Sequence, residues 1–208
     1  MTRFNNCTLV FVQHAQAKTA SDDEMRILTR EGRRQAIGLM EQLAGMRFDE
    51  VIVSTAVRAK LTAGLIVGND YSSRIHEIES MYGSLNATDH RELLKMFEDL
   101  GYSRPLADYF SHRHNPALRR LSAECALDIK EELGGTVDNE TILFVGHPVL
   151  LNGLIYFMFD EGEIKTLALT HVLGECGAIR VNTNGHGDAD AKVVERVKID
   201  SRVEAIVN

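Results

Sequence analysis

The chain has 208 residues, of which 44% are hydrophobic and 25% are charged, and these proportions exclude a disordered chain, a coiled coil and a collagen-like repeat. The formal net charge of -7 argues against nucleic acid and anionic membranes as partners. Three widely spaced cysteines form no C-x-x-C pair, so they predict neither a disulfide framework nor a zinc knuckle and favour a reducing, cytoplasmic setting.

The predicted elements alternate between strands and helices. TLVFVQ (8–13) is a continuous apolar, β-branched run, which is typical of a strand buried on both faces of a parallel sheet. The other predictions, in chain order, are a helix from about Thr29 to Gly45, a strand at 49–54, a helix at 55–69, a strand from 74 that leads into a loop by 84, helices at 89–101 and 116–135, a strand at 141–146, a helix at 148–159, and strands at 165–171, 176–184 and 191–199. This order predicts an α/β fold with a mostly parallel central sheet and an antiparallel edge.

The sequence shows no linker, repeat or signal segment, and it contains no run of roughly 18 apolar residues that a membrane span requires. We therefore expect one domain over residues 1–208, in the cytoplasm.

Polar side chains of catalytic type follow three of the predicted strands. Gln13 and His14 follow the first, Ser54 ends the second with Arg58 one helical turn later, and His147 follows the strand at 141–146. In an open α/β sheet, ligands bind at the carboxyl ends of the strands, where helix N-termini point their amide groups. Two imidazoles and a guanidinium at this edge favour phosphoryl chemistry, with one imidazole as the nucleophile.

Each of these residues has an ordinary alternative. A lone histidine after a strand is more often a polar loop residue, and an arginine on a helix is by default solvated or ion-paired. The functional reading gains weight because all three occur at equivalent places in separate strand–helix units.

Four segments together resemble the histidine phosphatase (phosphoglycerate mutase-like) superfamily. LVFVQHAQA (9–17) is similar to the family's strand followed by Arg-His-Gly, and ILTREGRRQA (27–36) is similar to Leu-Thr-x-x-Gly-x-x-Gln-Ala. VIVSTAVRAKLTA (51–63) and ILFVGHPVLLNGL (142–154) resemble the family's later arginine and histidine motifs. The likeness is greatest to the small branch of SixA-type phosphohistidine phosphatases, and it implies a three-layer αβα sandwich.

The resemblance also implies roles for individual residues. His14 would form a phosphohistidine, while Arg58 and His147 would bind the phosphoryl oxygens. The proton donor would be Glu79, which precedes a glycine by four residues as in the mutase branch, with Glu77 as the second choice. The implied enzyme is a metal-independent, cofactor-free phosphatase whose substrate is a phosphorylated small molecule or a phosphoprotein.

The sequence departs from the family motif on both sides of His14. Gln13 stands where the family has arginine, and Ala15 stands where it has glycine. Glutamine offers a neutral amide in place of a charged, bidentate fork, so phosphate binding is expected to weaken about tenfold or more. Ala15 also lacks the backbone freedom of glycine.

Two functional outcomes remain open. The pocket is either a slow or differently tuned phosphatase, with Gln13 in the phosphate site and help from Lys18, Arg26 or Arg74, or a phosphate-binding regulatory domain without turnover. The persistence of His14, Arg58 and His147 favours the phosphatase.

The remaining candidates have weaker support. His112 and His114 could be a metal pair, but no third ligand has suitable spacing, and a polar loop role is favoured. His186 lies in a Gly/Asp/Asn-rich turn that is neither a complete calcium loop nor a P-loop. Cys125 lies on a predicted helix, where a buried apolar role is usual.

Overall fold

A six-stranded sheet forms the centre of the molecule. The computed structural model describes residues 3–43, 45–68, 73–83, 86–159, 162–184 and 189–194. The strand order is β4-β3-β6-β2-β7-β8, with β4, β3, β6 and β2 parallel to one another and β7 antiparallel to both of its neighbours. The strands of this sheet and of a separate two-stranded parallel sheet are β1 (Arg3–Asn5), β2 (Thr8–Gln13), β3 (Glu50–Ser54), β4 (Arg74–Ile78), β5 (Thr136–Asp138), β6 (Thr141–Gly146), β7 (Ala178–Thr183) and β8 (Ala189–Val194).

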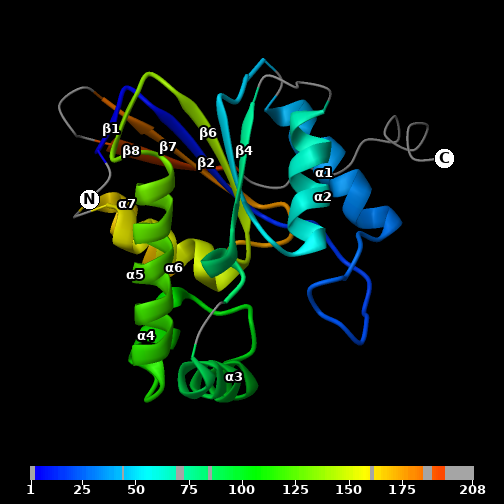
Figure 1. Cartoon of the computed structure of the whole chain (residues 1–208), viewed down its shortest axis with the longest axis vertical. Helices are drawn as coiled ribbons and strands as arrows, with labels where there is room; N and C mark the ends of the chain where they lie inside the picture. Colours follow the sequence, from blue (N-terminus) through cyan, green and yellow to red (C-terminus); the bar gives the residue numbers. More distant parts are fainter. Residues whose placement is uncertain are drawn as a thin grey trace.

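Helices cover both faces of the central sheet (Figure 1). In the figure, α1 and α2 lie to one side of the sheet, and α5, α6 and α7 lie to the other. The helices of the described chain are α1 (Arg30–Gln42), α2 (Val57–Val67), the short 3-10 helix η1 (Glu79–Met81), α3 (Ala87–Leu100), α4 (Leu106–Ser111), α5 (Asn115–Glu132), α6 (Pro148–Met158) and α7 (Glu163–Thr170).

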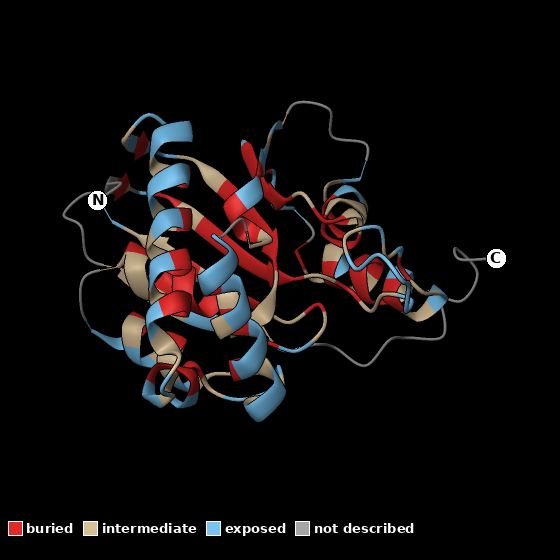
Figure 2. Cartoon of the chain, turned by 60° about the horizontal axis from the view of Figure 1, so that its bottom comes forward, coloured by how far each residue is buried: buried red, intermediate tan, exposed pale blue. Residues whose placement is uncertain are grey.

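Alternate residues of the buried strands supply two separate hydrophobic cores. Leu9 and Phe11 of β2 face the α5–α7 side, where Phe11 stacks on Phe144 of β6 with ring centroids 4.5 Å apart. Val10 and Val12 face the α1–α2 side. This period of two, with both faces buried, explains why the strands read as unbroken apolar runs. Figure 2 shows the buried strands between helices that are exposed on their outer faces.

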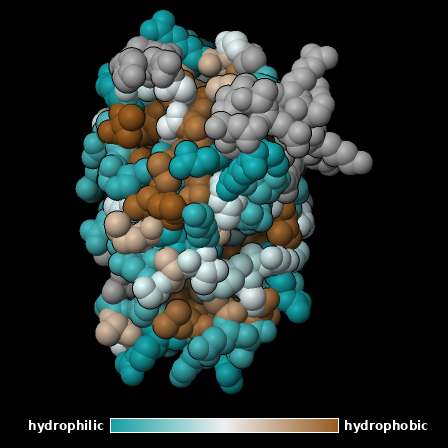
Figure 3. Space-filling view, turned by 90° about the vertical axis from the view of Figure 1, so that its right-hand side faces the viewer, coloured by the Kyte–Doolittle hydropathy of each residue, from teal (hydrophilic) through white to brown (hydrophobic). Residues whose placement is uncertain are grey.

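The side of the molecule that carries α1 and α2 keeps some hydrophobic surface, which Figure 3 shows among hydrophilic side chains. Leu61 and Leu65 of α2 are only partly buried against the core beneath them. No helix in the described part of the chain is long and apolar enough to cross a membrane.

A third, smaller core joins α3, α4, α5 and α6, with Met96, Tyr109 and Leu118 at its centre. Asp89 of α3 is buried and forms an ion pair with Arg120 of α5. Figure 1 shows α3 and α4 beyond the end of the central sheet.

The observed fold confirms the predicted α/β sandwich with a mostly parallel sheet and an antiparallel edge from β7 and β8. One predicted strand was wrong, because residues 165–171 lie mainly in α7. Leu167 and Leu169 alternate as in a strand, but Ile164 and Ala168 are four residues apart and are buried together on one helical face. The predicted strand at 191–199 extends past the described residues, and His186 lies outside them. The short elements β1, β5 and α4 were not predicted.

Candidate active site

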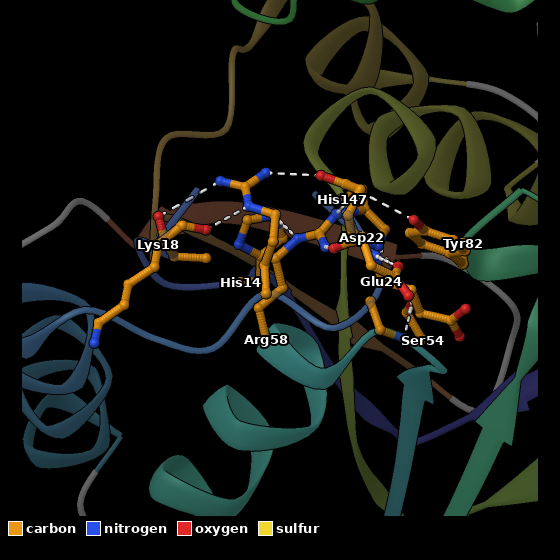
Figure 4. A network of polar contacts seen from close by, with 12 residues as sticks. His14, Lys18, Asp22, Glu24, Ser54, Arg58, Tyr82 and His147 are labelled. Atoms are coloured by element: carbon orange, nitrogen blue, oxygen red, sulfur yellow. Dashed lines mark hydrogen bonds and ion pairs between the residues drawn. The ribbon is translucent and has the colours of Figure 1, made fainter. Parts of the chain in front are cut away.

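Three of the predicted side chains meet at the carboxyl edge of the parallel strands (Figure 4). His14 directly follows β2, Arg58 is in the first turn of α2 after β3, and His147 follows β6 as the N-cap of α6. Arg58 Nε donates to His14 Nε2 at 3.1 Å, and Arg58 Nη2 lies 3.4 Å from His147 Nδ1. The two imidazole centroids are 5.1 Å apart. Because β3, β6 and β2 are neighbours in the sheet, residues far apart in sequence form one cluster.

The His14 ring presents an unprotonated Nε2 to the site. Nδ1 lies 2.8 Å from the Ala15 carbonyl oxygen, which can only accept, so Nδ1 carries the proton. Nε2 accepts the hydrogen bond from Arg58 and therefore carries none. Burial, reinforced by the positive charge of Arg58 and opposed by the Ala15 carbonyl, lowers the pKa of His14 to about 4. At neutral pH this imidazole therefore has the form that a nucleophile requires.

His147 has the opposite tautomer. A guanidinium can only donate, so the Nδ1 atom that faces Arg58 is unprotonated. Nε2 then carries the hydrogen and lies 3.1 Å from the Ser54 hydroxyl oxygen at the end of β3. Burial and the nearby His14 and Arg58 hold the pKa of His147 well below its ordinary value. Both imidazoles are thus neutral, and Arg58 carries the positive charge between them.

An acidic residue that the sequence did not single out contacts Arg58. The Asp23 carboxylate accepts from Arg58 Nη2 at 2.9 Å and from Arg26 Nη1 at 2.9 Å, while the Asp23 backbone carbonyl accepts from Arg58 Nη1 at 2.6 Å. Burial favours the neutral acid, but the Arg26 hydrogen bond and the Arg58 charge outweigh it and lower the pKa of Asp23. No pattern in the polar segment 17–28 could have identified this residue, because its role depends on the path of the loop.

Tyr82 is a second residue that sequence reasoning missed. Its hydroxyl donates to Asp23 Oδ2 at 3.1 Å, and its ring centroid lies 5.5 Å from that of His147. The Arg58 guanidinium lies over the same ring, 5.7 Å from its centroid. Burial and the adjacent Asp23 raise the pKa of Tyr82 to about 12, so the hydroxyl remains a donor at neutral pH.

The Leu-Thr-x-x-Gly-x-x-Gln segment holds the loop that follows His14. The Thr29 hydroxyl caps α1 by accepting from the Gly32 amide at 2.9 Å, and the Thr29 amide donates to the Gln16 carbonyl at 3.0 Å. The Gln35 side chain accepts from the Gln16 amide at 2.9 Å. A Cβ at Gly32 would lie only 2.0 Å from the Gln16 carbonyl oxygen, so only glycine allows this approach.

Thr62 connects the backbone beside His14 to that of Arg58. Its buried hydroxyl accepts from the Ala15 amide at 3.0 Å and donates to the Arg58 carbonyl at 2.7 Å. This explains the threonine four residues after Arg58: one turn along α2, it fixes the helix against the residue next to His14.

The side chain of Gln13 contacts the backbone between α7 and β7. With its amide oriented to satisfy its neighbours, the nitrogen donates to the carbonyls of Gly174 at 3.0 Å and Leu173 at 2.5 Å. Its place in the phosphate site therefore stays a prediction. Ala15 is fully buried, and it is not among the non-glycine residues with positive φ in the described chain, so alanine fits there without left-handed strain.

Four other residues were predicted to act in or beside the site, namely Glu79, Glu77, Lys18 and Arg74. Glu79 directly follows β4 at the same sheet edge and has an exposed side chain, while Glu77 pairs with Lys60 at 3.1 Å. The Lys18 side chain points away from His14 in Figure 4. Arg74 begins β4 and pairs with Glu50 and Glu140, which places it at the opposite end of the strands, so it does not assist the site.

The histidine pair and the helical cysteine have structural partners. His112 Nε2 lies 3.2 Å from the Asp99 carboxylate, and the His112 ring centroid lies 5.5 Å from that of His114. Within the described ranges, no group of three His, Cys, Asp or Glu side chains is arranged to hold a metal ion. Cys125 is buried on α5, and burial raises the pKa of its thiol to about 12. These residues give no indication of a second reactive centre.

Known proteins resemble this chain in sequence pattern and in fold. The model of the histidine phosphatase superfamily (branch 1) matches residues 9–193. Similar solved structures include a protein described as phosphohistidine phosphatase SixA from Nakamurella multipartitia, with 20% identity over 92% of this chain and 96% of that chain and a TM-score of 0.58. Phosphoserine phosphatase from Entamoeba histolytica has 22% identity over 91% and 97% of the two chains and a TM-score of 0.59. Alpha-ribazole phosphatase from Shigella flexneri has 20% identity over 90% and 95% and a TM-score of 0.61.

No curated protein matches the sequence significantly. The solved structures show the fold, since their identities are low, whereas the family model spans the segments that supply His14, Arg58 and His147. The chain belongs to the histidine phosphatase superfamily (branch 1).

Proposed function

We propose that the protein is a phosphatase that hydrolyses a phosphomonoester or a protein phosphohistidine through a covalent phosphohistidine on His14. The observation that carries the proposal is the unprotonated Nε2 of His14 within hydrogen-bond distance of Arg58. The lowered pKa of His14 keeps this nitrogen available as a nucleophile at neutral pH. The structural neighbours named as phosphohistidine, phosphoserine and ribazole phosphatases support this substrate class.

The proposed reaction has two steps. In the first, His14 Nε2 forms a bond to phosphorus while the bond from phosphorus to the leaving atom breaks, and the leaving atom takes a proton from Glu79, the proposed donor. In the second, water attacks phosphorus, the bond from phosphorus to His14 Nε2 breaks, and Glu79 takes a proton from the water, which releases inorganic phosphate and restores both His14 and the acid. Arg58 and His147 hold the charge that spreads over the phosphoryl oxygens, without a metal or cofactor.

A second candidate function is an anion-binding regulatory domain that does not turn over its ligand. The position of Gln13 favours this alternative, because its amide donates to the carbonyls of Leu173 and Gly174 and adds no donor beside His14. In this alternative, Arg58 still binds a phosphate group, but the site lacks the second positive charge that arginine at position 13 gives the family.

Activity measurements separate the two functions. A chromogenic phosphomonoester and a phosphohistidine protein are offered to the wild-type protein, His14→Ala and Arg58→Ala. We expect His14→Ala to lose at least about 10³-fold in kcat, because the proposed covalent intermediate forms on His14. Equal rates in the wild type and His14→Ala would exclude the covalent mechanism. Thermal stabilisation by phosphate without turnover, abolished in Arg58→Ala, would support the anion-binding domain.

A further inference from the structure

The loop between β2 and α1 brings Asp23 onto the catalytic arginine. An isolated bridge pairs Ala17 with Leu28, and the Lys18 amide donates to the Ile27 carbonyl at 2.8 Å, so the loop is closed at its base. Near its tip, the Val57 amide at the start of α2 donates to the Glu24 carbonyl at 3.0 Å. These backbone contacts hold the loop over the first turn of α2.

Asp23 occupies the donors of Arg58 that a phosphoryl group would use. Arg58 Nε donates to His14, Nη1 donates to the Asp23 carbonyl, and Nη2 donates to the Asp23 carboxylate. A carboxylate presents two oxygens with partial negative charge, which is the geometry that a guanidinium also recognises in a phosphate. The structure therefore places a carboxylate of its own chain on a guanidinium nitrogen that a phosphoryl oxygen would use.

The other carboxylate oxygen of Asp23 holds a second arginine at the site. Arg26 Nη1 donates to Asp23 Oδ1 at 2.9 Å, and Arg26 Nε donates to the Lys18 carbonyl at 2.7 Å, which fixes the guanidinium across the loop. The charge of Arg26 reaches the imidazoles, since it contributes to the lowered pKa values of His14 and His147. Asp23 therefore bridges two guanidinium groups beside the nucleophile.

We infer that Arg26 and Arg58 form a two-arginine clamp for the phosphoryl group, and that Asp23 is its resting occupant, which the substrate displaces. In this arrangement Arg26 supplies the second positive charge that Gln13 does not. The inference rests on the proposed phosphatase function and identifies how its site binds phosphate.

Charge and exposure favour the displacement of the Asp23 carboxylate by a phosphate group. Two guanidinium groups and one carboxylate leave a single net positive charge, whereas the two guanidinium groups alone match the double charge of a phosphate dianion. The Asp23 side chain is 55% exposed, so it can turn into water at little cost in solvation. The Tyr82 hydroxyl, which now donates to Asp23, is left as a further donor for the incoming oxyanion.

Displacement of Asp23 by phosphate predicts opposite effects on phosphate affinity when Asp23 and Arg26 are substituted. An internal competitor lowers the apparent affinity for phosphate, because only molecules in which the clamp is free can bind it. The apparent Kd is the intrinsic Kd divided by the fraction of such molecules. Removing the charge of Asp23 should therefore lower the Kd for inorganic phosphate about tenfold. Removing Arg26 should raise this Kd about tenfold, the size expected for losing one charge-assisted hydrogen bond.

Isothermal titration calorimetry with inorganic phosphate tests these effects on the full chain. Asp23→Asn is compared with Asp22→Asn, which removes the same charge from the same loop at a side chain that accepts from the Glu24 amide. Arg26→Ala is compared with Arg33→Ala on the exposed face of α1. The double variant Asp23→Asn/Arg26→Ala completes a cycle, and circular dichroism verifies that each variant is folded.

The inference is supported if Asp23→Asn binds phosphate more tightly than Asp22→Asn, and if Arg26→Ala weakens binding in both backgrounds. It is overturned if Asp23→Asn binds no more tightly than its control, or if Arg26→Ala behaves like Arg33→Ala. Arg58→Ala distinguishes a failure of the proposed function: unchanged phosphate binding in that variant means that the cluster is not a phosphate site at all.

Discussion

His14 must release a hydrogen bond before it can attack phosphorus, because its Nε2 lone pair accepts from Arg58 in this structure. An arriving phosphoryl oxygen is a better acceptor for a guanidinium than a neutral imidazole nitrogen is, since both partners are then charged. The Arg58 donor should therefore transfer to the substrate and leave the lone pair free. In the proposed mechanism, Arg58 thus couples phosphate binding to release of the His14 lone pair.

Glu79 is the residue on which the proposed proton transfer depends. We expect Glu79→Gln to lower kcat about 10²–10⁴-fold with an alkyl phosphomonoester such as phosphoserine, because the alkoxide leaving group needs a proton. A nitrophenyl phosphate should be affected far less, since its leaving group is stable as an anion. Glu77→Gln is the matched control, because Glu77 is paired with Lys60, and its rates should equal those of the wild type. Similar losses with both substrates in Glu79→Gln would contradict a role in proton donation.

Residues of the site differ in how far the sequence identifies them. His14, Arg58 and His147 can be predicted because each follows a strand, and parallel strands bring such positions to one edge. Asp23 and Tyr82 cannot be predicted in this way, since their contacts depend on how two irregular segments cross the site. Amphipathic patterns describe helices and strands, but they contain no information about the path of a loop.

Helix α1 supports the loop that follows His14 through its close approach to the Gln16 backbone. The contact combines the Thr29 cap, the Gln35 side chain and the absence of a side chain at Gly32. The segment connects directly to His14, so a displacement of α1 is transmitted to the imidazole. The Leu-Thr-x-x-Gly-x-x-Gln segment therefore packs α1 against the loop that follows His14 and positions this loop.

Two glycines of α1 provide a matched test of this support. A Cβ at Gly32 would lie 2.0 Å from a backbone oxygen, whereas a Cβ at Gly38 would meet nothing within 4 Å. We expect Gly32→Ala to destabilise the protein by about 1–3 kcal/mol through overpacking and to lower kcat by displacing His14. Gly38→Ala should leave kcat unchanged and stabilise the protein by about 0.5–1 kcal/mol, because alanine is the better helix former. Urea unfolding and steady-state kinetics measure both effects, and equal behaviour of the two variants would argue against the support.

The sequence predicts helices and strands correctly where the period of its hydrophobic residues is unambiguous. The strands β2, β3 and β6 are unbroken apolar runs, and α5 has a clear helical period with Pro116 in its first turn. Residues 165–171 were assigned wrongly because a short segment with alternating leucines fits both periods. Its helical state follows from packing against α6, with Asn152 of α6 donating to the Ala168 carbonyl at 3.0 Å.

The charge of the whole molecule has the opposite sign from that of its site. The chain carries a net charge of -7, yet the cluster at the carboxyl edge of the sheet contains Arg26 and Arg58 beside two neutral imidazoles. In the middle of the edge strand β4, His76 lies 2.8 Å from Glu50 of β3 and 2.6 Å from Glu132 of α5. Burial disfavours its charged form, but these carboxylates outweigh burial and raise the pKa of His76. The pKa of His76 is therefore shifted in the opposite direction from the pKa values of His14 and His147.

These opposed histidines predict a maximum in the free energy of unfolding near neutral pH. Between about pH 4 and 6.5, the unfolded chain binds protons that the half-buried His14 and His147 do not, so stability falls as the pH is lowered through this range. His76 has a raised pKa, so its contribution is complete below pH 6.5 and is lost as the pH rises above that value.

Urea unfolding in phosphate-free buffers at pH 5, 7 and 9 tests both limbs of this profile. The wild-type free energy of unfolding should rise from pH 5 to pH 7, and His14→Ala should remove about 2 kcal/mol of that rise, because a shift from 6.5 to about 4 corresponds to roughly that difference at pH 5. His76→Gln should not diminish the rise from pH 5 to pH 7 and should flatten the decline between pH 7 and 9. An unaltered acid limb in His14→Ala would mean that His14 is protonated in the native state, which would remove the unprotonated Nε2 on which the proposed phosphatase mechanism depends.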